Sequence, residues 1–197
     1  MDVPVKRGRG RPASATREQV LALATERFLA GERIDVQSIA RDLGLARTTV
    51  YRWFKDREAL VGEVLATLTE RGLASSRLET PGVGGLALLQ ALDRFSREIV
   101  RTRGLRALLS QERERALRLM NSTGGPVHAR VVAAVERMIV SEVEAGDYSP
   151  PFAPRTLAYA IVCVTNAFLY DDAVSGIRGD TERLYEVEAA LLGVSVE

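Results

Sequence analysis

The sequence contains very little cysteine and histidine, and this scarcity excludes several classes of protein. A single cysteine, Cys163, among 197 residues rules out an intramolecular disulfide framework. One histidine, His128, together with that cysteine cannot supply the ligand set of a zinc site, so we expect no metal and no cofactor. The same shortage leaves no convincing Ser/His/acid or Cys/His set of catalytic residues. We therefore predict that the protein is not an enzyme.

Long apolar runs are also missing. The longest charge-free stretch of the apolar C-terminal region covers residues 156–170, which is 15 residues. That is shorter than the roughly 20 residues needed to span a bilayer. The charged N-terminus is not followed by an apolar segment of the kind found in secretory signals. We expect a cytoplasmic protein that does not contact a membrane.

The pattern that does recur is helical. No segment alternates apolar and polar residues as a half-buried strand would, whereas many segments place apolar residues three or four positions apart. This periodicity predicts an all-α protein of about nine helices. The first lies between a cap at Ser14 or Thr16 and a stop at Gly31; the others are expected near residues 36–43, 47–54, 57–68, 86–102, 105–120, 127–145, 155–174 and 181–192. The Pro/Gly-rich break at residues 81–85 is interpreted as a hinge.

The near-neutral net charge of +1 conceals two opposite halves. Residues 1–55 carry eleven basic and six acidic side chains, a net charge of +5, and the rest of the chain carries −4. A basic front on an acidic body favours binding of a polyanion through the front. We divide the chain into a basic arm (1–14), a DNA-binding domain (15–60) and a helical ligand-binding and dimerisation domain (61–197).

Residues 36–54 have the pattern of a helix-turn-helix. Ala40 lies where two short helices would cross, and Gly44 lies in the turn, where glycine adopts a positive φ at little cost. Five apolar residues fall on one face, namely Ile39, Leu43, Leu45, Val50 and Trp53. The opposite face carries hydrogen-bond donors suited to bases and phosphates, namely Arg47, Thr48, Tyr51, Arg52 and Lys55. The alternative is a plain corner of two helices with a solvated charged face.

These residues resemble the signature of the TetR/AcrR family of transcriptional regulators. The resemblance rests on Ile39–Ala40, Gly44, Thr49–Val50–Tyr51, Phe54 and Arg57–Glu58–Ala59–Leu60, and covers about residues 15–65. It implies a homodimer in which three N-terminal helices bind double-stranded DNA at a palindromic operator. It also implies a divergent C-terminal domain that binds a small molecule, with the last two helices pairing across the dimer axis.

The resemblance also implies roles for individual residues. Gln37, Arg47 and Thr48 match positions that read bases, and Thr49 and Tyr51 match phosphate contacts. Arg57 stands where the family usually has a lysine directed at the DNA backbone. Trp53 matches a position often occupied by histidine, and a phosphate contact through its indole N–H and a place in the core fit it equally well. Ala46 replaces the usual serine cap of the recognition helix, at a cost of about 1 kcal/mol.

The N-terminal arm adds a second DNA-binding signal. Arg9–Gly10–Arg11–Pro12 resembles the core of an AT-hook, in which glycine lets the backbone enter a narrow minor groove and the arginines follow its negative potential. The alternative is a non-specific, solubilising tail.

The C-terminal domain gives weaker signals. Leu157, Ile161, Val164 and Phe168 form one apolar stripe and Leu184, Val187, Leu191 and Leu192 another, which we interpret as the dimer bundle, although a core stripe would look the same. Candidate ligand contacts are Met120, Tyr159, Asn166 and Tyr170, each of which is also compatible with a satisfied core position. His128, just after a Gly/Pro break, is expected to be exposed. Glu112 and Glu114, with Arg113, Arg115 and Arg118, are expected to form a solvated helix face.

A partial resemblance to the quorum-signal-degradation (QsdR-type) branch rests on residues 108–112, 157–162 and 168–170, and hints at a lactone-like or fatty-acid-like ligand. The sequence as a whole predicts a dimeric repressor that a small molecule releases from its operator. A constitutive architectural DNA-binding protein is the alternative, and an enzyme fused to a helix-turn-helix is disfavoured by the lack of catalytic sets.

Overall fold

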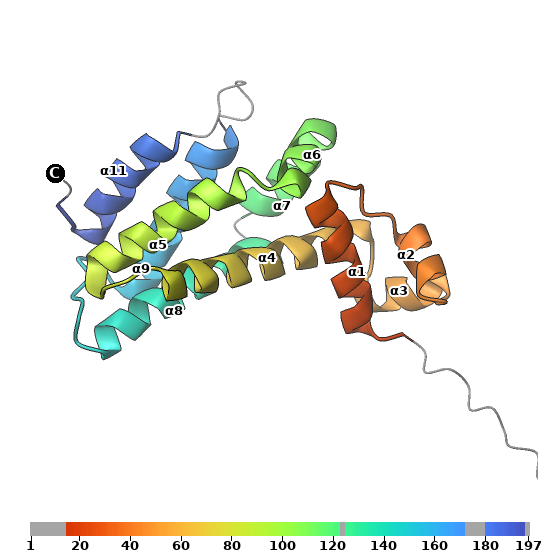
Figure 1. Cartoon of the computed structure of the whole chain (residues 1–197), viewed down its shortest axis with the longest axis horizontal. Coiled ribbons are helices and arrows are strands. Elements are labelled where there is room, and N and C mark those ends of the chain that lie inside the picture. Colours follow the sequence, from red (N-terminus) through yellow and green to blue (C-terminus); the bar gives the residue numbers. More distant parts are fainter. Residues whose placement is uncertain (1–14, 123–124, 172–179, 196–197) are drawn as a thin grey trace, which may run out of the picture.

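The computed structural model describes residues 15–122, 125–171 and 180–195. Within these ranges all regular secondary structure is helical (Figure 1). Ten α-helices and one short π-helical segment form an elongated molecule, with α1, α2 and α3 at one end and the remaining helices packed along α4. The predicted all-α class is confirmed, and the helix count is close to the predicted nine.

Local capping explains where the first helices begin. The Thr16 hydroxyl accepts from the Gln19 N–H, and the Gln19 side chain accepts in return from the Thr16 N–H, which starts α1 (Arg17–Ala30). Asp35 caps α2 (Val36–Asp42) by accepting from two backbone N–H groups. Gly44, in the turn that follows, has φ 64°, as predicted. Ala46 gives α3 (Arg47–Phe54) no side-chain cap, also as predicted.

The long helix α4 (Arg57–Glu79), which Asp56 caps, connects the two ends of the molecule. Its first turns pack against α1 and α3, and its later turns pack against α5 (Gly84–Ile99) and α8 (Pro126–Glu144). The predicted domain boundary at residue 60 therefore lies inside one continuous helix. Buried side chains of α1 to α4 form a single apolar cluster with residues of the C-terminal helices, among them Leu105, Leu108 and Met120.

Two predicted helices of the C-terminal body differ from the structure. The segment predicted as one helix at 105–120 is two, α6 (Arg103–Gln111) and α7 (Arg113–Asn121), because the backbone of Glu112 leaves the helical region at φ −137°. The segment predicted at 155–174 is α-helical in α9 (Pro154–Asn166) and continues as the π-helical segment η1 (Ala167–Asp171). The last helix, α11 (Thr181–Leu192), ends at Gly193, which has φ 67°.

The break at residues 81–85 was interpreted as a hinge, but the structure places it inside the C-terminal body. It joins α4 to α5, which pack against each other. Glu142 of α8, only 6% exposed, accepts from the backbone N–H of Gly84 at 2.7 Å and from the Arg77 guanidinium at 2.5 and 2.9 Å. Arg77 also donates to the carbonyl of Gly82. These bonds fix the turn between α4 and α5 to α8. In the described part of the chain, no helix is both long and apolar enough to cross a membrane.

Candidate functional site

The outer face of α2 and α3 carries the polar residues that the sequence predicted for DNA contact. Gln37 is exposed in the first turn of α2, and Arg47 and Thr48 are exposed in the first turn of α3. Val50 and Phe54, on the opposite face of α3, are buried against the core. Helices α2 and α3, which carry these polar residues, lie at one end of the molecule (Figure 1).

The basic residues of this end fall into two groups. Arg17, Arg27 and Arg33 form ion pairs with Glu63, Asp42 and Glu112 respectively. Four others, on α2 and α3 or just after them, form no ion pair with any residue of the described ranges, namely Arg41, Arg47, Arg52 and Lys55. No acidic side chain of the described residues neutralises their charge, so this end can attract a polyanion.

Two aromatic residues of α3 lie between the core and the outer face. Tyr51 and Trp53 are both half-buried and pack against the apolar cluster of the N-terminal helices. The Arg47 guanidinium lies 5.7 Å from the centre of the Tyr51 ring, a cation–π geometry that holds it on this face. Trp53 therefore has a packing role, and its predicted phosphate contact stays a prediction.

Arg57, predicted to contact the DNA backbone, has its guanidinium bound inside the protein. Its Nε donates to the carbonyl oxygen of Ile34 at 2.6 Å, and its two terminal nitrogens donate to the two oxygens of Glu112 at 2.6 and 2.7 Å. This two-pronged bond connects the start of α4 to the junction of α6 and α7. The DNA contact of Arg57 stays a prediction, and it would have to compete with Glu112.

The prediction that Glu112 lies on a solvated helix face is wrong. Its side chain is 13% exposed and accepts from Arg33 and Arg115 as well as from Arg57. The hydrogen bonds from Arg57 lower the pKa of the Glu112 carboxyl to about 2, and Arg33 and Arg115 add to the effect. The break between α6 and α7 is what turns this side chain inward, and periodicity alone did not reveal it.

A second contact between the two ends of the molecule depends on a glycine. Gly104, in the first turn of α6, lies directly against the backbone of Phe28 in α1. A Cβ built on Gly104 would lie 2.7 Å from the Phe28 carbonyl carbon and closer still to its oxygen. Only a residue without a side chain permits this approach of α6 to α1.

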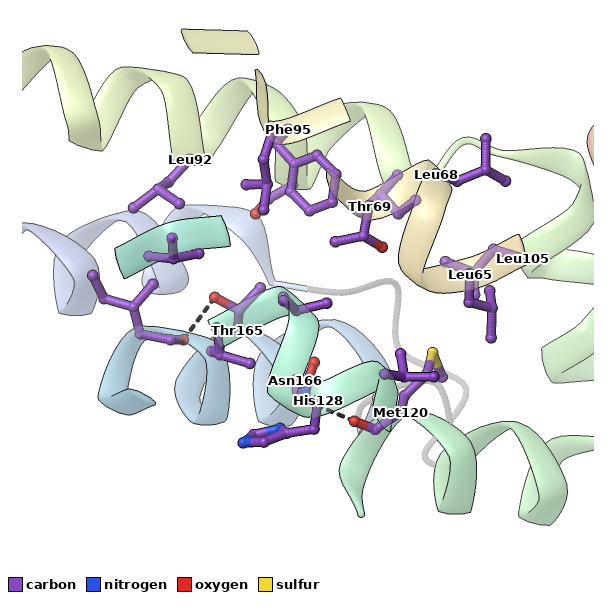
Figure 2. Close-up of a pocket in the computed structure, with 18 of the residues that line it drawn as sticks. Leu65, Leu68, Thr69, Leu92, Phe95, Leu105, Met120, His128, Thr165 and Asn166 are labelled. Carbon is purple, nitrogen blue, oxygen red and sulfur yellow. Dashed lines mark hydrogen bonds between the residues drawn. The ribbon is translucent and has the colours of Figure 1, made fainter. Parts of the chain in front are cut away.

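A cavity of about 50 Å³ lies in the C-terminal body, between α4, α5, α8 and α9 (Figure 2). Most of its wall is apolar, with Leu65 and Leu68 from α4, Leu92 and Phe95 from α5, and Val131 from α8. This volume admits only a few water-sized groups. Helix α4 thus forms one side of the cavity and also carries Arg57 at its other end.

Five polar side chains interrupt the apolar wall, namely Thr69, Ser96, His128, Thr165 and Asn166. The prediction that His128 is exposed is wrong, because it lies in the first turn of α8, which packs inward, and is 3% exposed. Burial lowers the pKa of His128. Ser96 was not predicted from the sequence. Its hydroxyl lies on the apolar helix face formed by Leu92 and Phe95, and a polar residue on such a face could have identified it as a candidate ligand contact.

The structure separates the predicted ligand contacts. Met120 and Asn166 line the cavity, and the Asn166 side chain donates to the Met120 carbonyl oxygen at 3.3 Å (Figure 2). Tyr159 does not line it: the residue is 46% exposed, and its ring packs against that of His128 in a T-shaped arrangement with the centroids 5.5 Å apart. His128, and not Tyr159, belongs to the wall. The side chain of Tyr170 and the arm with Arg9 and Arg11 lie outside the described residues.

A buried carboxyl lies behind one of the lining residues. Glu188 of α11 is 0% exposed, and its Oε1 lies 2.8 Å from the Thr165 hydroxyl, which also lies 2.8 Å from the Ile161 carbonyl oxygen. Burial raises the pKa of Glu188 to about 7. A protonated Glu188 can donate to Thr165 while the single Thr165 proton is donated to Ile161, so the neutral acid fits this arrangement.

We expect this carboxyl to make the protein less stable above neutral pH. Because its pKa is higher in the folded chain than the ordinary 4.5, the stability that it contributes is complete below about pH 4.5 and is lost as the pH rises through about 7. Glu188→Gln, which mimics the neutral acid, should therefore raise the urea midpoint relative to the parent at pH 8 but not at pH 5. Equal differences at both pH values would contradict this assignment.

The interpretation of the two apolar stripes as a dimer bundle is wrong for half of their members. Leu157, Ile161, Leu184 and Leu192 are each at most 1% exposed, because α9 and α11 pack these side chains against other helices of the same chain. Val164, Phe168, Val187 and Leu191 keep part of their surface exposed. Among the residues described, no three His, Cys, Asp or Glu side chains are grouped as metal ligands would be.

Comparisons with known proteins agree with this architecture. Residues 83–193 match the family model described as the tetracyclin repressor-like C-terminal domain. The structure of the transcriptional repressor QsdR from R. erythropolis is 28% identical, covers 92% of this chain and 96% of its own, and superposes with a TM-score of 0.84. The repressor AlkX from Dietzia sp. shares the fold at 23% identity, 90% and 97% coverage and a TM-score of 0.60. No curated protein sequence matches. The family match over more than half of the chain, together with the helix-turn-helix end, shows that this chain belongs to the TetR family of transcriptional regulators.

Proposed function

We propose that this TetR-family regulator is a homodimeric repressor that leaves its operator when a small apolar molecule enters the cavity beside α4. The observation that carries the proposal is the position of α4, which forms part of the cavity wall and also packs against α1 and α3. A ligand changes DNA affinity only if it prefers the conformation that does not bind DNA.

The cavity is too small for a ligand in its present form. Small-molecule sites in proteins usually have volumes of about 300–1,000 Å³, whereas this cavity measures about 50 Å³. A ligand must therefore separate α4 from α8 and α9, and α4 transmits the shift to α1 and α3. The Arg57–Glu112 bond and the Gly104–Phe28 contact connect the same two parts of the molecule.

On the DNA side, we propose that Gln37, Arg47 and Thr48 contact bases and that Thr49, Tyr51, Arg52 and Trp53 contact the sugar–phosphate backbone. The exposed first turns of α2 and α3 and the unpaired charges of Arg47 and Arg52 support this assignment. The arm with Arg9 and Arg11 would add minor-groove contacts. Two copies of α3 reading successive major grooves require a palindromic site.

Selection of bound DNA from a random pool tests this assignment. We expect a palindromic motif, and we expect Arg47→Ala to lower affinity for that motif by about 10- to 100-fold while affinity for random DNA changes less, because a bidentate base contact is worth about 1–3 kcal/mol. Tyr51→Ala should weaken binding to both DNAs. Fluorescence anisotropy at fixed salt measures each affinity.

Arg71→Ala is the matched control, since Arg71 is an exposed arginine on α4, four turns after its start. It should leave both affinities nearly unchanged. A uniform loss for operator and random DNA on Arg47→Ala would overturn the base-reading role.

For the dimer we propose the outer surface of α9 and α11, where apolar side chains remain partly exposed. These are Tyr159, which is 46% exposed, and the half-buried Cys163, Val187 and Leu191. Tyr159→Glu should place a charge in that interface and weaken dimerisation at least tenfold in sedimentation velocity. Phe152→Glu, the same kind of change at a 53% exposed aromatic outside both helices, is the control. Equal dimer affinity in both variants would place the interface elsewhere.

A further inference from the structure

Among the described residues, the wall of the cavity beside α4 contains polar side chains but no Asp, Glu, Lys or Arg. A ligand that enters it would lose water around every atom that it buries. An ionised group loses far more hydration energy than a hydroxyl or an amide does, and only a paired counter-ion offsets this loss. The described part of the wall offers no such counter-ion: it has no Lys or Arg, and burial lowers the pKa of His128 and so favours its neutral form.

Two of the polar side chains in the wall are buried and have no hydrogen-bond partner among the described residues. The Ser96 hydroxyl, on a residue 1% exposed, and both ring nitrogens of His128, on a residue 3% exposed, form no hydrogen bond. Buried polar groups are nearly always satisfied, because each unsatisfied one costs about 1–3 kcal/mol. Thr165 and Asn166, by contrast, already bond to Ile161 and Met120 (Figure 2).

We infer that the ligand of this cavity is an uncharged, mainly apolar molecule that hydrogen-bonds to Ser96 or to His128. The inference rests on the proposed ligand response and adds the chemical class of the ligand to it. Ser96 can donate to an oxygen, and neutral His128 offers one donor and one acceptor. A hydroxyl, ester or amide on an apolar chain meets these requirements.

A carboxylate is disfavoured by a second feature of the same wall. Glu188 contacts Thr165 from behind, at 2.8 Å, and is fully buried. With a pKa of about 7, part of the Glu188 population is ionised at pH 7.5, and a ligand carboxylate would have to bind beside that charge or force Glu188 to take up a proton. The wall therefore selects neutral head groups over anionic ones.

Ligands that share one chain and differ only in the head group test the inference. We would titrate the full-length protein with octane, 1-octanol, octanamide, octanoate and octylamine at pH 7.5, and measure binding by calorimetry and by the shift in melting temperature. Octanol and octanamide should bind at least tenfold more tightly than octanoate or octylamine. Octane should bind more weakly than octanol because it leaves Ser96 and His128 unpaired.

Two variants test whether Ser96 and His128 cause the preference for octanol over octane. Ser96→Ala and His128→Leu each remove an unpartnered polar group, so the ligand-free protein should keep or raise its melting temperature. The variant that removes the partner of the octanol hydroxyl should weaken octanol binding about five- to tenfold, and both variants should leave octane binding nearly unchanged. Thr165→Val is the control: it removes a hydroxyl that is already bonded, so it should lower the melting temperature without this octanol-specific loss.

Tighter binding of octanoate, or no binding of any probe, would overturn the inference. So would equal octanol affinity in the parent and in both variants. Release of operator DNA is measured separately by anisotropy. Neutral probes that bind through Ser96 or His128 but release no DNA would support the ligand class while overturning the proposed response.

Discussion

Gly104→Ala is expected to lower the free energy of unfolding by about 2–3 kcal/mol, although the substitution introduces only one methyl group. The added Cβ would overlap the backbone of Phe28, with the carbonyl carbon 2.7 Å away and the oxygen nearer. Backbone cannot move aside as the end of a flexible side chain can, so α6 has to withdraw from α1. Overpacking of this kind typically costs 1–3 kcal/mol. Urea unfolding followed by circular dichroism measures the loss.

The sign of the expected stability change distinguishes a backbone clash from the effect of helix propensity. Within a helix, alanine is more favourable than glycine by about 1 kcal/mol, so propensity alone predicts stabilisation. Ser110→Ala, at an exposed position of the same helix, is the control and should be nearly neutral. Because the clash separates α6 from α1, operator affinity should change as well. An unchanged or higher urea midpoint for Gly104→Ala would show that the approach of the two helices is not tight.

Glu112→Gln is expected to destabilise the protein by about 2–3 kcal/mol. The substitution keeps the shape of the side chain but removes the charge that faces Arg57, whose side chain is 20% exposed. Removing one partner of a largely buried ion pair is costly because the remaining charge stays desolvated. The pKa of Glu112 is lowered to about 2, so its contribution is present above about pH 4.5 and lost as the pH falls toward 2. The penalty of the variant should therefore shrink in acid.

Glu58→Gln is the matched control, because Glu58 pairs with Arg115 at the surface, where both side chains are nearly half exposed. It should cost no more than about 0.5 kcal/mol. A double-mutant cycle with Arg57→Gln and Glu112→Gln should show strong non-additivity. If Glu58→Gln and Glu112→Gln lowered the free energy of unfolding equally, Glu112 would contribute no more to stability than a surface ion pair does.

The helix-turn-helix end was predictable because its signals are local. Capping at Thr16 and Asp35, the positive φ of Gly44 and the missing cap at Ala46 depend on residues within a few positions of one another. Apolar spacing then predicted which faces of the short helices are buried. The family resemblance added the DNA-reading roles, which no contact within the chain tests.

The C-terminal body was less predictable because its important contacts join residues far apart in sequence. Glu112 meets Arg57 across 55 positions, and Gly104 meets Phe28 across 76. The charge pattern around Glu112 is the same whether the helix is continuous or broken there, so the sequence favoured a solvated face. His128 was misplaced because a Gly/Pro break indicates a loop but does not indicate which face of the next helix packs inward.

One apolar cluster joins α1 to α4 with residues of the C-terminal helices, so unfolding of the DNA-binding end is coupled to that of the C-terminal body. Any molecule that binds the folded chain shifts its unfolding to higher temperature, wherever it binds. An inducer in the cavity would therefore protect α1 to α3 against unfolding and hydrogen exchange while it lowers their affinity for DNA. In this protein, heat resistance of the DNA-binding end and occupancy of the operator would change in opposite directions.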